Sequence, residues 1–170
     1  MRRIGVIVAL GALLSMLGGV AAASPALADT GTRQLHLAAT SANFTSFTCL
    51  NALCSLGEAT VVANASSNLS TGTGSYQADL IVDFLGQPAP GGNCNIVDEH
   101  TVFTFGNGTI LIHSHHKDCA TVGLRIDTHF DVTGGTGAFA GATGGGHQFS
   151  AVNDNAPAAT PVIYNGTITF

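Results

Sequence analysis

Residues Gly134–Gly144 read GGTGAFAGATG, and this segment follows directly on a stretch of alternating apolar and polar residues, Leu124–Val132. Glycine reaches backbone conformations with positive φ that other residues rarely adopt, and it lets two backbones approach closely. The one large side chain in the segment is Phe139, so we expect Ala138–Ala140 to form a single short helical turn that buries this ring. No Gly-Lys-Ser/Thr follows and no long helix begins here, which excludes a phosphate-binding P-loop.

Alternation of apolar and polar residues continues along most of the chain and predicts β-strands with one dry face and one wet face. Turn signals at residues 70–72, 88–92 and 106–108 separate these segments, and no stretch predicts a long helix. The pattern therefore favours an all-β domain, either an antiparallel barrel or a sandwich. The eight or nine expected strands are Gln34–Ala39, Asn43–Thr48, Glu58–Asn64, Tyr76–Phe84, Asn95–Phe105, Thr109–Lys117, Leu124–Val132, Gly146–Val152 and Val162–Phe170.

The glycine-rich segment resembles the G-G-T-G-x-F-x-G-A-x-G signature of the allene oxide cyclase/dirigent superfamily, especially its small secreted bacterial members. The resemblance implies a closed, calycin-like, eight-stranded antiparallel β-barrel with an apolar cavity, no cofactor, and a homotrimer like that of the plant proteins. Plant members steer either the cyclisation of an unsaturated fatty-acid epoxide or the coupling of phenoxy radicals. Their catalytic residues lie outside the motif, so the resemblance carries over the fold and no active-site residue. The residues of this sequence that match the motif are Gly134, Gly135, Thr136, Gly137, Phe139, Gly141 and Gly144. Ala138 stands where relatives often have a charged or bulky residue.

The N-terminus predicts export. Residues 1–28 consist of two arginines, an apolar run and a small-residue site ending at Ala28, which is typical of a secretory signal peptide cleaved before Asp29. An uncleaved membrane anchor is the alternative, because about 20 apolar residues can span a bilayer. Residues 29–170 then form one secreted domain with three basic and ten acidic residues, a net charge of −7. This balance excludes a nucleic-acid-binding protein, and no later segment predicts a membrane-spanning helix.

Four cysteines in an exported chain favour disulfides over a zinc site, because no pair has the C-x2-C spacing. Cys49 and Cys54 are close enough in sequence to close a small loop. Cys94 and Cys119 flank a predicted hairpin around Gly106-Asn107-Gly108, and they lie opposite each other if Phe105 pairs with Gly108. We therefore expect Cys49–Cys54 and Cys94–Cys119.

The same register assigns the two faces of this hairpin. Phe103, Phe105, Ile110 and Ile112 share one face, which predicts that this face lines the interior and that Glu99 and His116 point inward as diagonal neighbours. A carboxylate beside an imidazole in an apolar cavity could act as a general base or orient a ligand, or both side chains could be core residues with satisfied polar tips. The candidate ligand-binding side chains are Tyr76, Phe103, Phe105, Ile112 and Tyr164.

The outer face of the hairpin carries a histidine cluster. The register places His100 opposite His113 and Asp98 opposite His115, with His129 on a neighbouring strand. Histidines at alternate strand positions can bind zinc or copper, although most such pairs are only solvated. The sequence as a whole predicts a secreted barrel that binds a small apolar or aromatic molecule or serves as a scaffold. The alternatives are a cofactor-free cyclase or isomerase using Glu99 and His116, and a surface metal binder using His100, His113 and His115.

Overall fold

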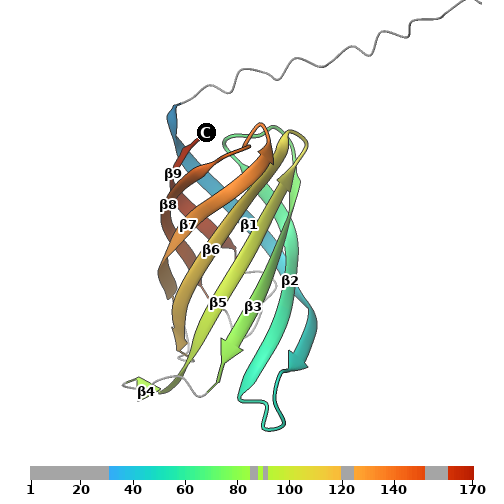
Figure 1. Ribbon diagram of the computed structural model, residues 1–170, viewed down its shortest axis with the longest axis vertical. Helices are drawn as coiled ribbons and strands as arrows, with labels where there is room; N and C mark the ends of the chain where they lie inside the picture. The colour runs from blue at the N-terminus through green and yellow to red at the C-terminus, as the bar shows by residue number, and fades with distance from the viewer. Residues whose placement is uncertain (1–30, 85–87, 90–91, 120–124, 152–160) are drawn as a thin grey trace, which may run out of the picture.

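The computed structural model describes residues 31–84, 88–89, 92–119, 125–151 and 161–170, and in these residues it contains nine β-strands and no helix (Figure 1). Strand propensity comes from alternation of residues such as Tyr76, Ala78 and Leu80 with polar neighbours. The strands are β1 (Thr32–Cys49), β2 (Leu56–Ser67), β3 (Gly74–Asp83), β4 (Pro88–Ala89), β5 (Gly92–Phe105), β6 (Gly108–Cys119), β7 (Arg125–Gly137), β8 (Thr143–Ala151) and β9 (Val162–Thr169).

Eight of these strands close into a barrel. Their order is β3-β2-β1-β9-β8-β7-β6-β5, every neighbouring pair is antiparallel, and β3 pairs with β5 to complete the circle. The short β4 pairs only with the start of β5. The structure thus confirms the all-β class and the closed antiparallel barrel, and the sandwich alternative is wrong because the sheet closes on itself and has no second layer.

The two ends of the barrel differ (Figure 1). We call upper the end that carries the β5–β6 turn, the β7–β8 turn and the C-terminus, and lower the end that carries β4 and the projecting β1–β2 hairpin. Two details depart from the expected strands. The segments Gln34–Ala39 and Asn43–Thr48 are one strand, because bulges between Thr40 and Asn43 and between Phe44 and Ser46 absorb the extra residues without ending the pairing with β2. β7 also runs on through the first glycines to Gly137.

The glycine-rich segment closes the upper end as expected. Phe139 is buried, and the turn around it is held by hydrogen bonds from the Phe139 amide to the Thr136 carbonyl and from the Ala142 amide to the Phe139 carbonyl. Gly137 has φ 61°, a conformation that favours glycine, and a Cβ there would collide with the Asn107 carbonyl. A Cβ on Gly135 would lie 2.5 Å from the carbonyl oxygens of both Phe139 and Thr109. The motif therefore lets a single turn fold back against the β5–β6 turn.

Aromatic side chains fill the upper half of the interior. Phe103 and Tyr164 meet edge to face with centroids 5.2 Å apart, and Phe130 approaches Tyr164 at 5.3 Å. Phe105 stacks on Phe103, while Phe139 packs against Phe170 at the very end. Such edge-to-face contacts stabilise beyond the area they bury. The upper half of the barrel is therefore a packed core.

One of the two expected disulfides is confirmed. Cys49 and Cys54 are bonded, with Cα atoms 4.8 Å apart, at the tip of the β1–β2 hairpin. Cys94 and Cys119 face each other in the β5–β6 register, as expected, but their side chains lie outside the described part of the structure, and this disulfide stays a prediction. The leader, residues 1–28, also lies outside it. The described residues contain no helix that is long and apolar enough to cross a bilayer.

Candidate functional site

A buried carboxylate stands at the centre of the barrel. Glu99, on the inward face of β5, is only 3% exposed. Its Oε1 accepts hydrogen bonds from Thr101 Oγ1 at 2.7 Å, Tyr164 Oη at 2.9 Å and Tyr76 Oη at 3.1 Å. Its Oε2 accepts from Gln148 Nε2 at 3.1 Å and, more weakly, from Ser114 Oγ at 3.5 Å. We call Glu99 and these five donors the Glu99 cluster, and its members come from β3, β5, β6, β8 and β9.

The two tyrosines of the cluster are strongly held in their neutral form. Burial raises the pKa of the Tyr76 phenol well above its usual range, and the charge of Glu99 raises it further. The pKa of Tyr164 is raised for the same two reasons, with burial again the larger, and Tyr76 adds to the effect. Both factors therefore favour the neutral hydroxyls, which donate hydrogen bonds to Glu99.

This burial predicts an alkaline signature that belongs to the cluster alone, because Tyr76 and Tyr164 are the only tyrosines and the chain has no Trp. In the unfolded chain both phenols ionise near pH 10, whereas the folded barrel keeps them neutral. The stability that the two neutral tyrosines contribute is complete below about pH 10. It falls as the pH rises from there toward the raised pKa values of the folded state, by up to about 2.7 kcal/mol per pH unit for two groups.

Absorbance of tyrosinate in the near ultraviolet measures this directly. We expect no tyrosinate signal from the folded protein as the pH passes 10, then the appearance of both tyrosinates together with loss of the β-sheet circular dichroism. The same protein in concentrated urea is the control and should titrate near pH 10. Independent titration of either tyrosine near pH 10 with the sheet intact would contradict the burial of the cluster.

The structure places His116 as the hairpin register predicts. Val97 lies opposite His116 and Glu99 opposite Ser114, so Glu99 and His116 are diagonal neighbours on the inward face. His116 is buried there. The predicted ligand-binding side chains are all buried as well, and they are Tyr76, Phe103, Phe105, Ile112 and Tyr164. Of these, the two tyrosines bond to Glu99 and the other three are part of the packed core.

Sequence reasoning missed three partners of Glu99. Thr101 and Ser114 follow from the hairpin register, since they share the inward face with Glu99, but their hydroxyls had not been connected with the carboxylate. Gln148 had no local signal, because its strand has few apolar residues and its inward direction depends on pairing with Tyr164. A polar residue opposite an inward tyrosine is the one clue that the sequence offers.

Exposure along the inward face differs between the two ends of the barrel. Above Glu99, Thr101, Phe103 and Phe105 are buried. Below it, Leu80 and Val82, which lie opposite Glu99 and Val97, are only partly buried. At the lower end Phe47 is 53% and Phe84 38% exposed, and their rings touch edge to face over Gly57. The inward face below Glu99 is therefore less completely buried than the face above it, and we call the side chains at this end the lower mouth: Phe47, Ala59, Leu80, Val82 and Phe84.

The outer face of the β5–β6 hairpin also has the predicted register, with His100 opposite His113 and Asp98 opposite His115. His113 Nε2 hydrogen-bonds Asp98 Oδ1 at 2.5 Å. This hydrogen bond, more than any other contact, lowers the pKa of Asp98 from its usual value. His129 lies on β7, the strand next to β6, one residue before Phe130, which pairs with Ser114. It pairs in turn with His147 on β8, whose Nδ1 bonds Asp127 Oδ1 at 2.9 Å.

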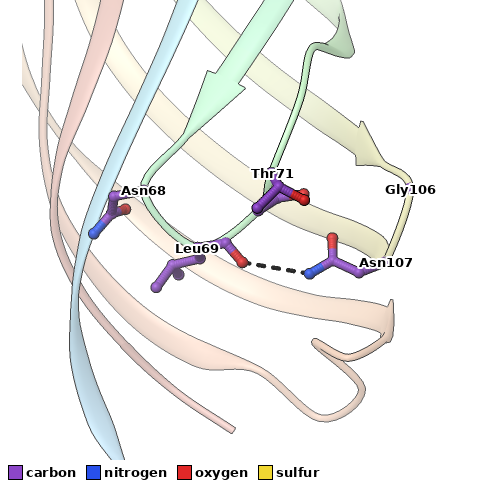
Figure 2. A pocket seen from close by; sticks show the side chains of 6 residues that line it. Asn68, Leu69, Thr71, Gly106 and Asn107 are labelled. Carbon is purple, nitrogen blue, oxygen red and sulfur yellow. Dashed lines mark hydrogen bonds between the residues drawn. The ribbon is translucent and has the colours of Figure 1, made fainter.

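A hollow of about 400 Å³ lies at the upper end between the loop after β2 and the β5–β6 turn (Figure 2). It is lined by residues 68–71, 106 and 107, and Asn107 Nδ2 donates to the Leu69 carbonyl at 3.3 Å. Ligand sites of this volume are usually lined mainly by apolar side chains. Leu69 is the one apolar side chain here, so this hollow lacks the usual lining of a ligand site.

Comparisons with known proteins leave the family open. No family model matches the chain, and no curated protein matches it either. Among solved structures the barrel is similar to a pyocyanin demethylase, with a TM-score of 0.40 and 12% sequence identity over 82% of this chain and 100% of that one. This distant likeness carries no argument about activity, and it does not confirm the resemblance to the allene oxide cyclase/dirigent superfamily. The chain is an eight-stranded closed antiparallel β-barrel with a buried polar cluster.

Proposed function

We propose that the protein binds a small, largely apolar or aromatic molecule in the lower half of the barrel, with the Glu99 cluster at the inner end of the site. The observation that carries this proposal is a carboxylate buried among five neutral donors in an interior whose other buried side chains, apart from His116, are apolar. Packed apolar side chains in place of a buried polar cluster are often as stable or more stable. The presence of this cluster where apolar side chains could have formed the core supports a binding role.

One atom of the cluster indicates the ligand's polar group. Gln148 directs its Nε2 to Glu99, and its buried Oε1 has no hydrogen-bond partner among the described residues. Reversing the amide would place oxygen against the Glu99 carboxylate, so the assigned orientation is the favourable one. A ligand with one O–H or N–H donor would satisfy Gln148 Oε1, while its apolar part would lie against Leu80, Val82 and the rings at the lower mouth.

The alternative is a cofactor-free cyclase or isomerase in which Glu99 takes a proton and His116 assists. The burial of Glu99 and His116 on the same inward face supports this alternative. Against it stands the saturation of Glu99, since a carboxyl group offers about four lone-pair positions and five donors already approach this one. A substrate proton would have to displace one of them. Binding without turnover therefore fits the geometry better.

Secretion, family and assembly belong to the same proposal. The Cys49–Cys54 disulfide supports an oxidising compartment, in line with the predicted leader. The burial of Phe139 at the end of a closed barrel supports a relationship to the allene oxide cyclase/dirigent superfamily. The homotrimer that this resemblance implies stays a prediction.

The test uses the full chain expressed in a secreting host. Native mass spectrometry of the exported protein reads both the leader cleavage after Ala28 and the mass of any co-purified molecule. Titration with N-phenyl-1-naphthylamine, a neutral aromatic probe with one N–H donor, then measures binding by its fluorescence. We expect saturation at one probe per chain, and at least about tenfold weaker binding in Gln148→Leu, because the N–H donor would lose its acceptor.

A pair of adjacent residues supplies the matched control. Val82 points inward at the lower mouth, whereas Ile81 is exposed on the outer face of the same strand. We expect Val82→Trp to abolish probe binding and Ile81→Trp to leave it unchanged. Equal binding by both variants, or no saturable binding together with a bare polypeptide mass, would overturn the proposal. Chemical conversion of a co-purified molecule during incubation would instead favour the cyclase or isomerase.

A further inference from the structure

Three histidines on the outer face of the β5–β6 hairpin converge on one carboxylate. Asp98 and His100 alternate with inward Glu99 on β5, while His113 and His115 alternate with inward Ser114 on β6. The strands are hydrogen-bonded neighbours in the middle of a closed barrel, so their backbones hold the four outward side chains in a fixed order. This surface is separated from the interior by the sheet itself, and its role is independent of the proposed ligand site.

The distances bring these side chains within reach of one ion. Asp98 Oδ1 lies 2.5 Å from His113 Nε2 and 3.9 Å from His115 Nδ1, and Asp98 Oδ2 lies 3.9 Å from His100 Nε2. One ligand atom from each of Asp98, His100 and His113 falls within 4.8 Å of the others. Two ligands at bond lengths of 2.0–2.2 Å around a tetrahedral ion stand about 3.4 Å apart. Small rotations of these side chains, which move the ligand atoms by about an ångström, would therefore bring the atoms to the spacing of a tetrahedral metal site.

We propose that Asp98, His100 and His113 bind a divalent zinc- or copper-type ion on the outer face of the barrel, with His115 as the nearest further imidazole. Imidazole nitrogen with one carboxylate oxygen is a donor set that suits zinc and copper, whereas calcium and magnesium require mostly oxygen ligands. His100 and His113 stack with ring centroids 4.7 Å apart, which keeps the two imidazoles side by side along the strand pair.

Carboxylates on the neighbouring strands also fit a metal site. Asp79 on β3 lies opposite His100, and Asp131 on β7 lies opposite His113. Histidine ligands of metals usually donate their second ring N–H to a carboxylate or carbonyl, which orients the ring. A simple ion pair between Asp98 and His113 would need neither His100 nor the acidic residues on both flanks. The whole arrangement matches a cation held between two strands better than it matches one surface ion pair.

Calorimetric titration of the exported, chelator-treated protein with zinc chloride tests the site. We expect one zinc per chain, with affinity lowered at least about tenfold in each of His100→Asn, His113→Asn and Asp98→Asn. His36→Asn is the matched control, because His36 is an exposed outer-face histidine that bonds Asn165 and lies on β1, away from the hairpin. Its affinity for zinc should equal that of the unmodified protein.

A second readout locates the ion. With copper(II) in place of zinc, the imidazole resonances of His100 and His113 should broaden first in nuclear magnetic resonance spectra, while those of His36 stay sharp. The variants all lie on the surface, and unchanged circular dichroism confirms that they fold. Absence of stoichiometric binding would overturn the proposal. So would equal affinities in all four variants, because binding would then be spread over exposed imidazoles.

Discussion

Replacement of Glu99 by leucine is expected to lower the free energy of unfolding by at least about 3 kcal/mol, measured by urea denaturation followed by circular dichroism. The substitution removes the common acceptor of Tyr76, Tyr164 and Gln148, all of which are buried. Each buried donor that loses its acceptor costs about 1–3 kcal/mol. Glu99→Gln keeps one carbonyl oxygen and should cost less, about 1–2 kcal/mol.

The control for this substitution is Glu58→Leu. Glu58 is an exposed glutamate on β2, and its loss should change stability by no more than about 0.5 kcal/mol. If Glu99→Leu were as stable as the unmodified protein, the buried donors would have partners other than Glu99, and the cluster would not be organised by the carboxylate.

A double-mutant cycle separates the hydrogen bonds from the change in volume. Tyr164→Phe alone should destabilise, because Tyr164 Oη donates to Glu99 at 2.9 Å. In the Glu99→Leu background the same substitution should be neutral or stabilising, since it removes a buried hydroxyl that has lost its acceptor. The two effects of Tyr164→Phe should then differ by about 1–3 kcal/mol. Simple additivity would mean that the hydroxyl and the carboxylate do not act on each other.

The β5–β6 hairpin shows how far the sequence alone can lead. The turn Gly106-Asn107-Gly108 sets the pairing of Phe105 with Gly108. Each further pair follows by moving one residue back along β5 and one residue forward along β6, and the side chains alternate between the two faces of the sheet. Local turn chemistry therefore predicted the inward direction of Glu99 and His116, the opposition of His100 and His113, and the facing positions of Cys94 and Cys119. Each of these relations spans at most 26 residues of chain.

The partners of Glu99 from β8 and β9 show where sequence reasoning ends. Gln148 is 49 and Tyr164 is 65 residues from Glu99, and neither belongs to a neighbouring strand. They meet it only because the sheet closes, so that side chains from distant strands share one narrow interior. Alternation predicts that a side chain points inward, but it does not predict which inward side chains meet. That depends on strand order and tilt, which no local pattern encodes.

The alternation of one strand also keeps the two proposals separate. Asp98, Glu99 and His100 are consecutive, yet Glu99 bonds to the interior cluster while Asp98 and His100 belong to the outer surface. Substitutions at Asp98 or His100 should thus leave the alkaline behaviour of the tyrosines unchanged, and Glu99→Gln should leave zinc binding unchanged. Failure of one proposal therefore carries no consequence for the other.

Removal of the Phe139 ring is expected to cost about 3–5 kcal/mol of unfolding free energy, as for other phenylalanine-to-alanine changes in packed cores. Phe139 is buried at the upper end, where it packs against Phe170 and anchors the turn that closes the barrel. Phe149→Ala is the matched control, because that ring is 39% exposed on the outer face of β8. It should cost no more than about 1 kcal/mol.

The same variant tests what the glycine-rich segment does. If the ring holds the turn in place, Phe139→Ala should also speed amide hydrogen exchange at Ala138–Ala142 well before global unfolding, since a local region that loses its apolar anchor opens independently. The amides of β5 and β6 around Glu99 should keep their protection, because that layer is held by the Glu99 cluster and by neighbouring strands on both sides. A uniform loss of protection would mean that the turn and the barrel unfold as one unit. A cost no larger than that of Phe149→Ala would mean that the glycines alone, through the fit of Gly135 and Gly137 against the β5–β6 turn, close the upper end.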